Sequence, residues 1–381
     1  MNTMIPLAVP NLTGNEKKYL DDCIDTTFVS SVGEYVNRFE QMVADATGSR
    51  FAVATSSGTT GIHVALTAAG VKRDDLVIIP TFTFIASANA VKHCGADPWL
   101  MDISLDNWCL DPKLVRSEIE KHCEKHTDGL YHKDTGRRVA AIMPVYTLGN
   151  IPDMNEFRTI ADEYGLSLVV DAACAIGATY NDEPFGGLAD LSVLSFNGNK
   201  TITCGGGGAV VGSNEELLNH VRHLTTTARV WPDYDFDEIG FNYRMTNIQA
   251  AVGCAQMERL DQFIDRKRYV RGYYEKELAG LKDKGISFFP TTSGSSCWYS
   301  GIVLREDSKL DDAKSICAHL KENGIESRTF WKPVHLQKPY SQSPVSTVSV
   351  SENLWQRVIT LPCSTGIFDE ELKKVRLFWI R

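Results

Sequence analysis

The chain has 381 residues, of which 43% are hydrophobic and 23% charged, and its net charge is −9. This length can bury a large core and predicts two domains, while the negative charge argues against nucleic acids and anionic membranes as partners. No apolar run is long enough to cross a bilayer, and the first residues lack the basic region and apolar run of a secretory signal, which predicts a cytoplasmic protein.

Two helices, at 15–27 and 34–47, are expected before the first strand. From residue 51 onward short apolar runs alternate with helical patterns, such as the one after the first strand and those at 88–95 and 153–165. The expected strands are FAVATSS, LVIIP, DPWLMDI, AAIMPVY, LSLVVDA, LSVLSF and GGAVVG. Continuous apolar strands between amphipathic helices predict an α/β fold with a mainly parallel sheet that is covered on both faces.

The pattern changes near residue 247, which predicts a large domain over 1–246 and a second part over 247–381. The second part should begin with one long, charge-rich helix and continue as a smaller α/β domain. Its expected elements include the strand-like run CWYSGIVLR, a helix near 311–323 and the aromatic loop RTFWKPVHLQKPY. Ten cysteines form no C-x-x-C pair, so we expect reduced thiols and neither a disulfide framework nor a metal site.

The segment LSVLSFNGNKTITCGGGGAVVG places Lys200 in a polar turn after a strand, just before the glycine run Gly205–Gly208. A lysine attacks a carbonyl only when it is neutral, so a catalytic lysine needs an enclosed site or cationic neighbours. On these residues alone, a solvated lysine beside a flexible glycine hinge is the simpler interpretation.

Asp171 strengthens the catalytic interpretation. It is a single carboxylate at the carboxyl end of the apolar strand LSLVVD, where ligands bind in α/β sheets. A carboxylate there could keep the pyridine nitrogen of pyridoxal phosphate protonated, which makes the ring an electron sink. The alternative is an ordinary helix N-cap.

Three further positions could border a cofactor. TSSGTTGIH, with Gly58, Thr59 and Thr60, follows a strand and opens a helix, so its free N–H groups could bind a phosphate, although it could also be a plain helix cap. Phe84 follows LVIIP and could stack on a flat ring or belong to the core. Asn242 lies among aromatic residues just before the expected long helix.

Together the ordered motifs SSGTTGIHVAL, PTFTFIASANA, VVDAA, SFNGNK, GGGGAVV and GFNYRMTNIQAAVG resemble the DegT/DnrJ-type sugar aminotransferases, which are fold type I enzymes that use pyridoxal phosphate. The resemblance runs from about residue 5 to the C-terminus. It implies that Lys200 is the Schiff-base lysine and that Asp171 is the partner of the pyridinium nitrogen. It further implies that the phosphate is bound by Gly58, Thr59, Thr60 and Ser195 and that Phe84 stacks on the ring. Ser30, Ser31 and His335 would contact the sugar nucleotide. Asn242 would reach the phosphate in the neighbouring subunit, which implies a homodimer with shared active sites. Cys174 departs from the family, which often has Gln, His or Glu at this ring-contacting position.

A finer resemblance, carried by FVSSVGEYVNRFE, GLYHKDTGRRVAAIMPV and HLQKPY, is to the subgroup that makes amino sugars for bacillosamine and legionaminic-type acids. It implies that L-glutamate is the amino donor and UDP-2-acetamido-4-keto-2,6-dideoxyhexose the acceptor. The alternatives are a 3-keto-sugar, a GDP- or dTDP-linked 4-keto-sugar, a sugar dehydratase, a cysteine desulfurase that uses Cys174, and a non-catalytic homologue. Lys200 argues against the dehydratase, because relatives of that kind replace the lysine with histidine.

Overall fold

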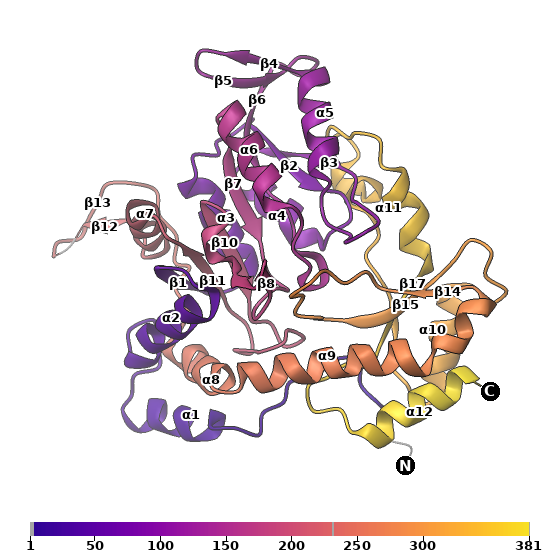
Figure 1. The fold of residues 1–381 in the computed structure, drawn as a ribbon. Helices are drawn as coiled ribbons and strands as arrows, with labels where there is room; N and C mark the ends of the chain where they lie inside the picture. Colours follow the sequence, from indigo (N-terminus) through magenta and orange to yellow (C-terminus); the bar gives the residue numbers. More distant parts are fainter. Residues whose placement is uncertain (1–3, 231, 381) are drawn as a thin grey trace.

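The computed structural model describes residues 4–230 and 232–380, and its core is a twisted sheet (Figure 1). Within these residues the sheet has nine strands, seven of which form the path β1-β11-β10-β7-β6-β2-β3, while the β4–β5 hairpin extends it from β6. The strands are β1 (Phe51–Thr55), β2 (Leu76–Pro80), β3 (Asp97–Met101), β4 (Cys123–His126), β5 (Gly129–His132), β6 (Arg137–Ile142), β7 (Ser167–Asp171), β10 (Leu191–Ser195) and β11 (Gly208–Gly212).

The sheet is mainly parallel, as predicted. Strands β10, β7, β6, β2 and β3 pair in parallel, whereas β11 is antiparallel to both β1 and β10. Strands such as β2 are buried along their whole length, which explains their uninterrupted apolar sequences. The parallel strands end along one edge of the sheet, where Asp171 and Ser195 are the last residues of β7 and β10.

Helices cover both faces of the sheet. One face packs against α2, α5, α6 and α8, and the other against α3, α4 and α7. Their bounds are α2 (Glu34–Thr47), α3 (Gly58–Ala68), α4 (Ile85–His93), α5 (Pro112–His122), α6 (Met154–Tyr164), α7 (Glu215–Thr225) and α8 (Asn247–Met257), while α1 (Glu16–Asp25) packs against α8. Two short ribbons, β8–β9 (Thr179–Tyr180 and Glu183–Pro184) and β12–β13 (Arg229–Val230 and Asp235–Phe236), lie outside the main sheet.

The prediction of one long helix after residue 247 is wrong in one respect, because the structure has two helices there. Helix α8 ends before Glu258, and α9 (Leu260–Glu277) begins after Arg259, whose ψ of 12° is not helical. Tertiary contacts hold this break. The Glu258 carboxylate accepts hydrogen bonds from Asn15, Tyr19 and Arg38, so the chain turns where the N-terminal segment crosses it.

The C-terminal part contains an antiparallel sheet in the order β14-β15-β17-β16, packed against α9, α10 and α12. The bounds are β14 (Ile286–Phe288), β15 (Ser300–Leu304), β16 (Arg328–Thr329), β17 (Val358–Leu361), α10 (Ala313–Glu322), α11 (Ser349–Leu354) and α12 (Asp369–Ile380). The N-terminal residues join this part, because Ile5 pairs with Ile325 and the Leu7 carbonyl accepts from Cys363 N–H. Within the described residues, no helix combines the length and apolar character needed to span a bilayer.

Candidate active site

A cavity of about 490 Å³ lies at the carboxyl edge of the large sheet, between it and the C-terminal part. This volume suits a small organic ligand. Seven of the predicted site residues line it: Gly58, Thr59, Phe84, Asp171, Cys174, Ser195 and Lys200. The sheet therefore brings together side chains that are up to 142 positions apart in the sequence (Gly58 to Lys200).

Asp171 is held rigidly at the end of β7. Its side chain is buried, Oδ2 accepts a hydrogen bond from Ser87 Oγ at 2.6 Å, and Oδ1 accepts one from Ala173 N–H at 3.0 Å. Burial raises the pKa of Asp171, while these two hydrogen bonds and the charge of Lys200 act in the opposite direction. A buried carboxylate of this kind is suited to hold a proton on a ligand nitrogen.

Lys200 lies in the turn between β10 and β11, where its N–H bonds to the Asn197 carbonyl. The half-buried side chain crosses the cavity, with Nζ 3.3 Å from Cys174 Sγ and 4.0 Å from the ring centre of Trp298. Burial raises the pKa of the Cys174 thiol, which makes it a neutral, weakly polar neighbour for the amine. The amine is thus enclosed by an aromatic ring and a thiol rather than placed in open solvent.

Helix α3 begins inside the cavity. Ser57 is its N-cap and forms a capping box with Thr60, while the N–H groups of Gly58 and Thr59 have no partner within the helix. Gly58 allows a close approach to β10, since a Cβ at this position would lie 2.8 Å from Ser195 Cβ. The helix N-terminus and the Ser195 hydroxyl together make a compact binding place for an anion.

Aromatic side chains from both parts of the chain line the cavity. Phe84, at the start of α4, is 57% exposed, so its ring is open to a ligand. From the C-terminal part, Trp298 stacks on Tyr299 with ring centres 4.0 Å apart, and Phe330 stacks on Trp331 at 4.1 Å. A flat ligand can be enclosed here by rings from both parts of the chain.

Five predicted site residues do not line this cavity in the single chain: Ser30, Ser31, Thr60, Asn242 and His335. The Thr60 hydroxyl is occupied in the capping box with Ser57. Ser30, Ser31 and Asn242 are exposed. His335 contacts Thr81 Oγ1 through Nδ1 at 2.6 Å and Glu352 through Nε2 at 3.2 Å. The roles implied for these residues by resemblance remain predictions.

Sequence reasoning missed the groups that support the site. Ser87 lies within the motif PTFTFIASANA, but its bond to Asp171 depends on the way α4 docks against β7. Asn199 anchors Trp298 and Tyr299, because its carbonyl accepts from Trp298 Nε1 at 2.8 Å and its amide donates to the Tyr299 hydroxyl at 3.2 Å. The runs CWYSG and RTFWK were visible as aromatic segments, but nothing local indicated that they face Lys200.

The residues of the cavity fit pyridoxal phosphate. Gly58, Thr59 and Ser195 offer N–H and hydroxyl donors for a phosphate, Phe84 offers an open ring face, and Asp171 offers a buried carboxylate. Glycines at 207 and 208 let the chain pass close to its neighbours beside the cavity. A Cβ at Gly208 would lie 2.6 Å from the Ser57 carbonyl oxygen, and one at Gly207 would lie 2.5 Å from Met245 Cε.

Comparisons with known proteins extend over nearly the whole chain. The model of the DegT/DnrJ/EryC1/StrS aminotransferase family matches residues 10–377. GDP-perosamine synthase of Caulobacter vibrioides is 35% identical over 376 residues, which cover 97% of this chain and 96% of the relative. GDP-perosamine synthase of Vibrio cholerae is 36% identical over 376 residues, covering 98% and 97%. Among solved structures, DesI in the presence of its TDP-sugar product superposes with a TM-score of 0.87 at 28% identity, covering 100% of this chain and 94% of DesI.

Proposed function

Because the chain belongs to the DegT/DnrJ/EryC1/StrS aminotransferase family, and is thus a pyridoxal-phosphate-dependent sugar aminotransferase, we propose that it moves the amino group of L-glutamate to a nucleotide-linked 4-keto-6-deoxyhexose. The observation that carries the proposal is the placement of Lys200 and Asp171 in one cavity, each with its own supporting contacts.

The residues of the cavity would have separate roles in the reaction. When bound, pyridoxal phosphate supplies a carbonyl that takes up the amino group and a ring that withdraws electrons from the reacting carbon. Asp171 would hold the proton on the ring nitrogen, and the start of α3 with Ser195 would hold the phosphate. Lys200 would move a proton to and from the reacting carbon as general base and acid, because its amine reaches across the cavity.

The motif resemblance and the similar proteins suggest different nucleotides for the acceptor sugar. The phrases of the bacillosamine and legionaminic subgroup favour a UDP-linked N-acetyl sugar, whereas the relatives from Caulobacter vibrioides and Vibrio cholerae are named for a GDP-linked product. We propose a GDP-linked acceptor first, since that support extends over 97% and 98% of the chain, and a UDP-linked acceptor second.

The test is a panel of GDP-, UDP- and dTDP-linked 4-keto-6-deoxy sugars incubated with the holoenzyme and L-glutamate. We expect one amino sugar by mass spectrometry and NMR, with an equal amount of 2-oxoglutarate. Lys200→Ala should lower the rate by several orders of magnitude, while Lys282→Ala, at an exposed position of the C-terminal part, should leave it unchanged. No amination of any 4-keto sugar, or full activity in Lys200→Ala, would refute the proposal.

We also propose a homodimer in which the exposed Asn242 completes the neighbouring site. In support, the segment before it presents exposed apolar side chains, with Tyr234 81% and Ile239 90% exposed, and the β12–β13 ribbon stands out from the body (Figure 1). Light scattering should give the mass of two chains. Asn242→Ala should weaken cofactor binding without changing that mass, and a monomer that is fully active would contradict the proposal.

A further inference from the structure

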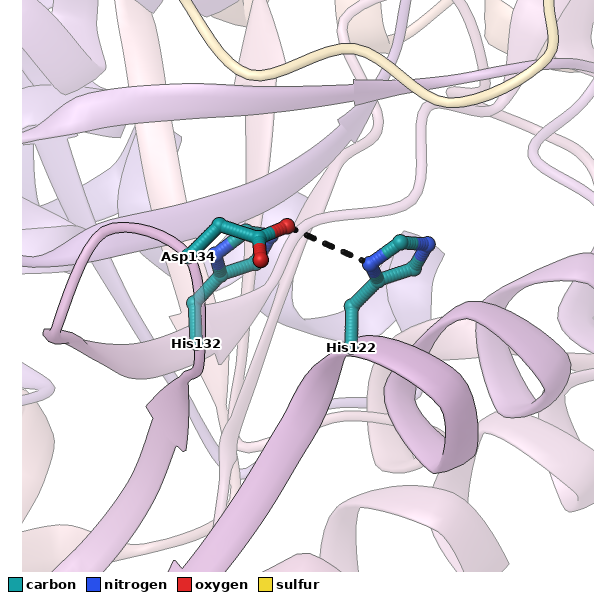
Figure 2. Close-up of side chains that lie close together, drawn as sticks. All are labelled: His122, His132 and Asp134. Carbon is teal, nitrogen blue, oxygen red and sulfur yellow. Dashed lines mark ion pairs between the residues drawn. The ribbon is translucent and has the colours of Figure 1, made fainter.

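A second cluster of polar side chains lies where the end of α5 meets the end of the β4–β5 hairpin. His122 is the last residue of α5, His132 is the last residue of β5, and Asp134 follows in the turn before β6 (Figure 2). One ligand atom from each of the three residues lies within 4.8 Å of the others, and His122 Nδ1 is 3.5 Å from Asp134 Oδ2. His122 belongs to a helix and the other two residues to the end of a hairpin, so neither their spacing nor the cysteine pattern indicated the cluster.

The local fold holds the two imidazoles in place. His132 is buried, its ring meets Trp99 edge-on with centres 4.7 Å apart, and its Nδ1 lies 3.3 Å from Thr135 Oγ1. The His122 ring is nearly parallel to it, at 5.9 Å and 5°. Lys133 N–H donates to the His122 carbonyl at 2.8 Å, which ties the end of α5 to the end of the hairpin. Contacts of this kind orient the rings of metal-binding histidines.

We propose that His122, His132 and Asp134 bind a divalent first-row transition metal ion of the zinc class. Two imidazoles and one carboxylate form a ligand set that suits such ions, and a water molecule can complete the coordination. Ligand atoms around zinc lie about 3.3 Å apart for bonds of about 2.05 Å. Because the three ligand atoms lie within 4.8 Å of one another, the side chains must move closer together when the ion binds, and the Asp134 side chain is exposed.

The surroundings of the cluster favour a cation. A hollow of about 320 Å³ borders the three residues and leaves room for a water ligand. Glu118 adds a second carboxylate, with Oε2 3.9 Å from His122 Nε2, while the ammonium group of Lys133 is bound to the Lys121 carbonyl. Because no residue that the structure describes lines both this hollow and the cofactor cavity, the ion would fasten α5 to the β4–β5 hairpin and would not take part in amino transfer.

The experiment titrates Co²⁺ into the full-length holoenzyme after treatment with a chelator. We expect one Co²⁺ per chain, visible d–d bands without a thiolate charge-transfer band, and a higher melting temperature. The double variant His122→Asn/Asp134→Asn should bind at least ten-fold more weakly, with unchanged cofactor absorbance and an unchanged melting temperature in chelator.

The matched control is His126→Asn/Asp128→Asn, on the same hairpin but outside the cluster, which should bind like the wild type. Absence of binding, a thiolate band, or equal affinity in the His122/Asp134 variant would overturn the proposal. Because the ten cysteines are all free, the thiolate band separates binding at a cysteine from binding at this cluster.

Discussion

Replacing Gly58 by alanine should disturb the start of α3 and, through it, the binding of the cofactor. The new Cβ would lie 2.8 Å from Ser195 Cβ and 3.2 Å from Ser195 Oγ, distances that real Cβ atoms avoid, so α3 and the end of β10 must separate. Overpacking of this size costs about 1–3 kcal/mol, and the better helix propensity of alanine offsets about 0.5–1 kcal/mol of it. We therefore expect a free energy of unfolding lower by about 1–2 kcal/mol in the apoprotein.

The same movement shifts the N–H groups of residues 58 and 59 away from the proposed phosphate-binding site. Hydrogen bonds to charged groups are worth about 1.5–3 kcal/mol each, so partial loss of one lowers affinity for pyridoxal phosphate about ten-fold. Urea denaturation of the apoprotein and titration with pyridoxal phosphate measure the two effects separately.

Two variants test the physical reason for these losses. Ser195→Gly in the Gly58→Ala background removes the clashing atoms and should restore most of the lost stability. Gly272→Ala in α9, where a Cβ would have no atom within 4 Å, should instead stabilise the protein by about 0.5–1 kcal/mol. Two outcomes would contradict this prediction: a Gly58→Ala protein that is as stable as the wild type and binds the cofactor equally well, or a Ser195→Gly change that restores no stability. The close approach of α3 to β10 would then determine neither stability nor cofactor binding.

Three further predictions concern buried polar groups. Asp171→Asn keeps the shape but loses the charge, and the amide cannot accept from both Ser87 and Ala173. We expect a loss of about 3–4 kcal/mol in transition-state stabilisation, or about 10²–10³-fold in single-turnover rate with glutamate, and a loss below ten-fold would contradict the role. Lys267→Met removes the buried ammonium that donates to the carbonyls of Trp298 (2.9 Å) and Cys363 (2.7 Å), and should lower the free energy of unfolding by about 2–4 kcal/mol in urea; an unchanged midpoint would show that these carbonyls find other donors. Burial lowers the pKa of His63 to about 4, whereas the ring in the unfolded chain takes up its proton near pH 6.5. The wild type should therefore lose about 2–3 kcal/mol of stability relative to His63→Gln as the pH falls from about 6.5 to 4. Denaturation of both proteins at both pH values measures this difference, and equal losses in the two proteins would contradict it.

The central sheet and the first half of the site were predictable because their signals are local. Strands such as β2 and β7 are buried on both faces, so their sequences are continuously apolar and easy to recognise. Asp171 is conspicuous for the same reason, since a carboxylate that ends a continuously apolar strand stands out in the sequence. Lys200 is assigned through Asp171 and the resemblance of the ordered motifs, because its turn alone favours a solvated lysine, and Gly58 is indicated by the change of a strand into a helix.

The rest depends on docking between distant segments. Trp298 and Trp331 face the cavity only because the C-terminal sheet packs across the edge of the large one. The break between α8 and α9 carries no glycine or proline, and it arises where the N-terminal segment bonds to Glu258. The β4–β5 hairpin is short and polar, so its residues resemble a loop until they pair.

The attachment of the first residues to the C-terminal part limits how the chain can be divided. Leu7 and Ile5 belong to the same hydrophobic cluster as β15 and α10, and Leu7 N–H donates to the Glu326 carboxylate. A fragment that starts at residue 247 would therefore expose the backbone edge that Ile5 normally covers. Removing the first ten residues from the full chain would expose the same edge. Leu7 is synthesised 319 positions before Glu326, so the C-terminal sheet gains this contact only after the whole large domain has been made.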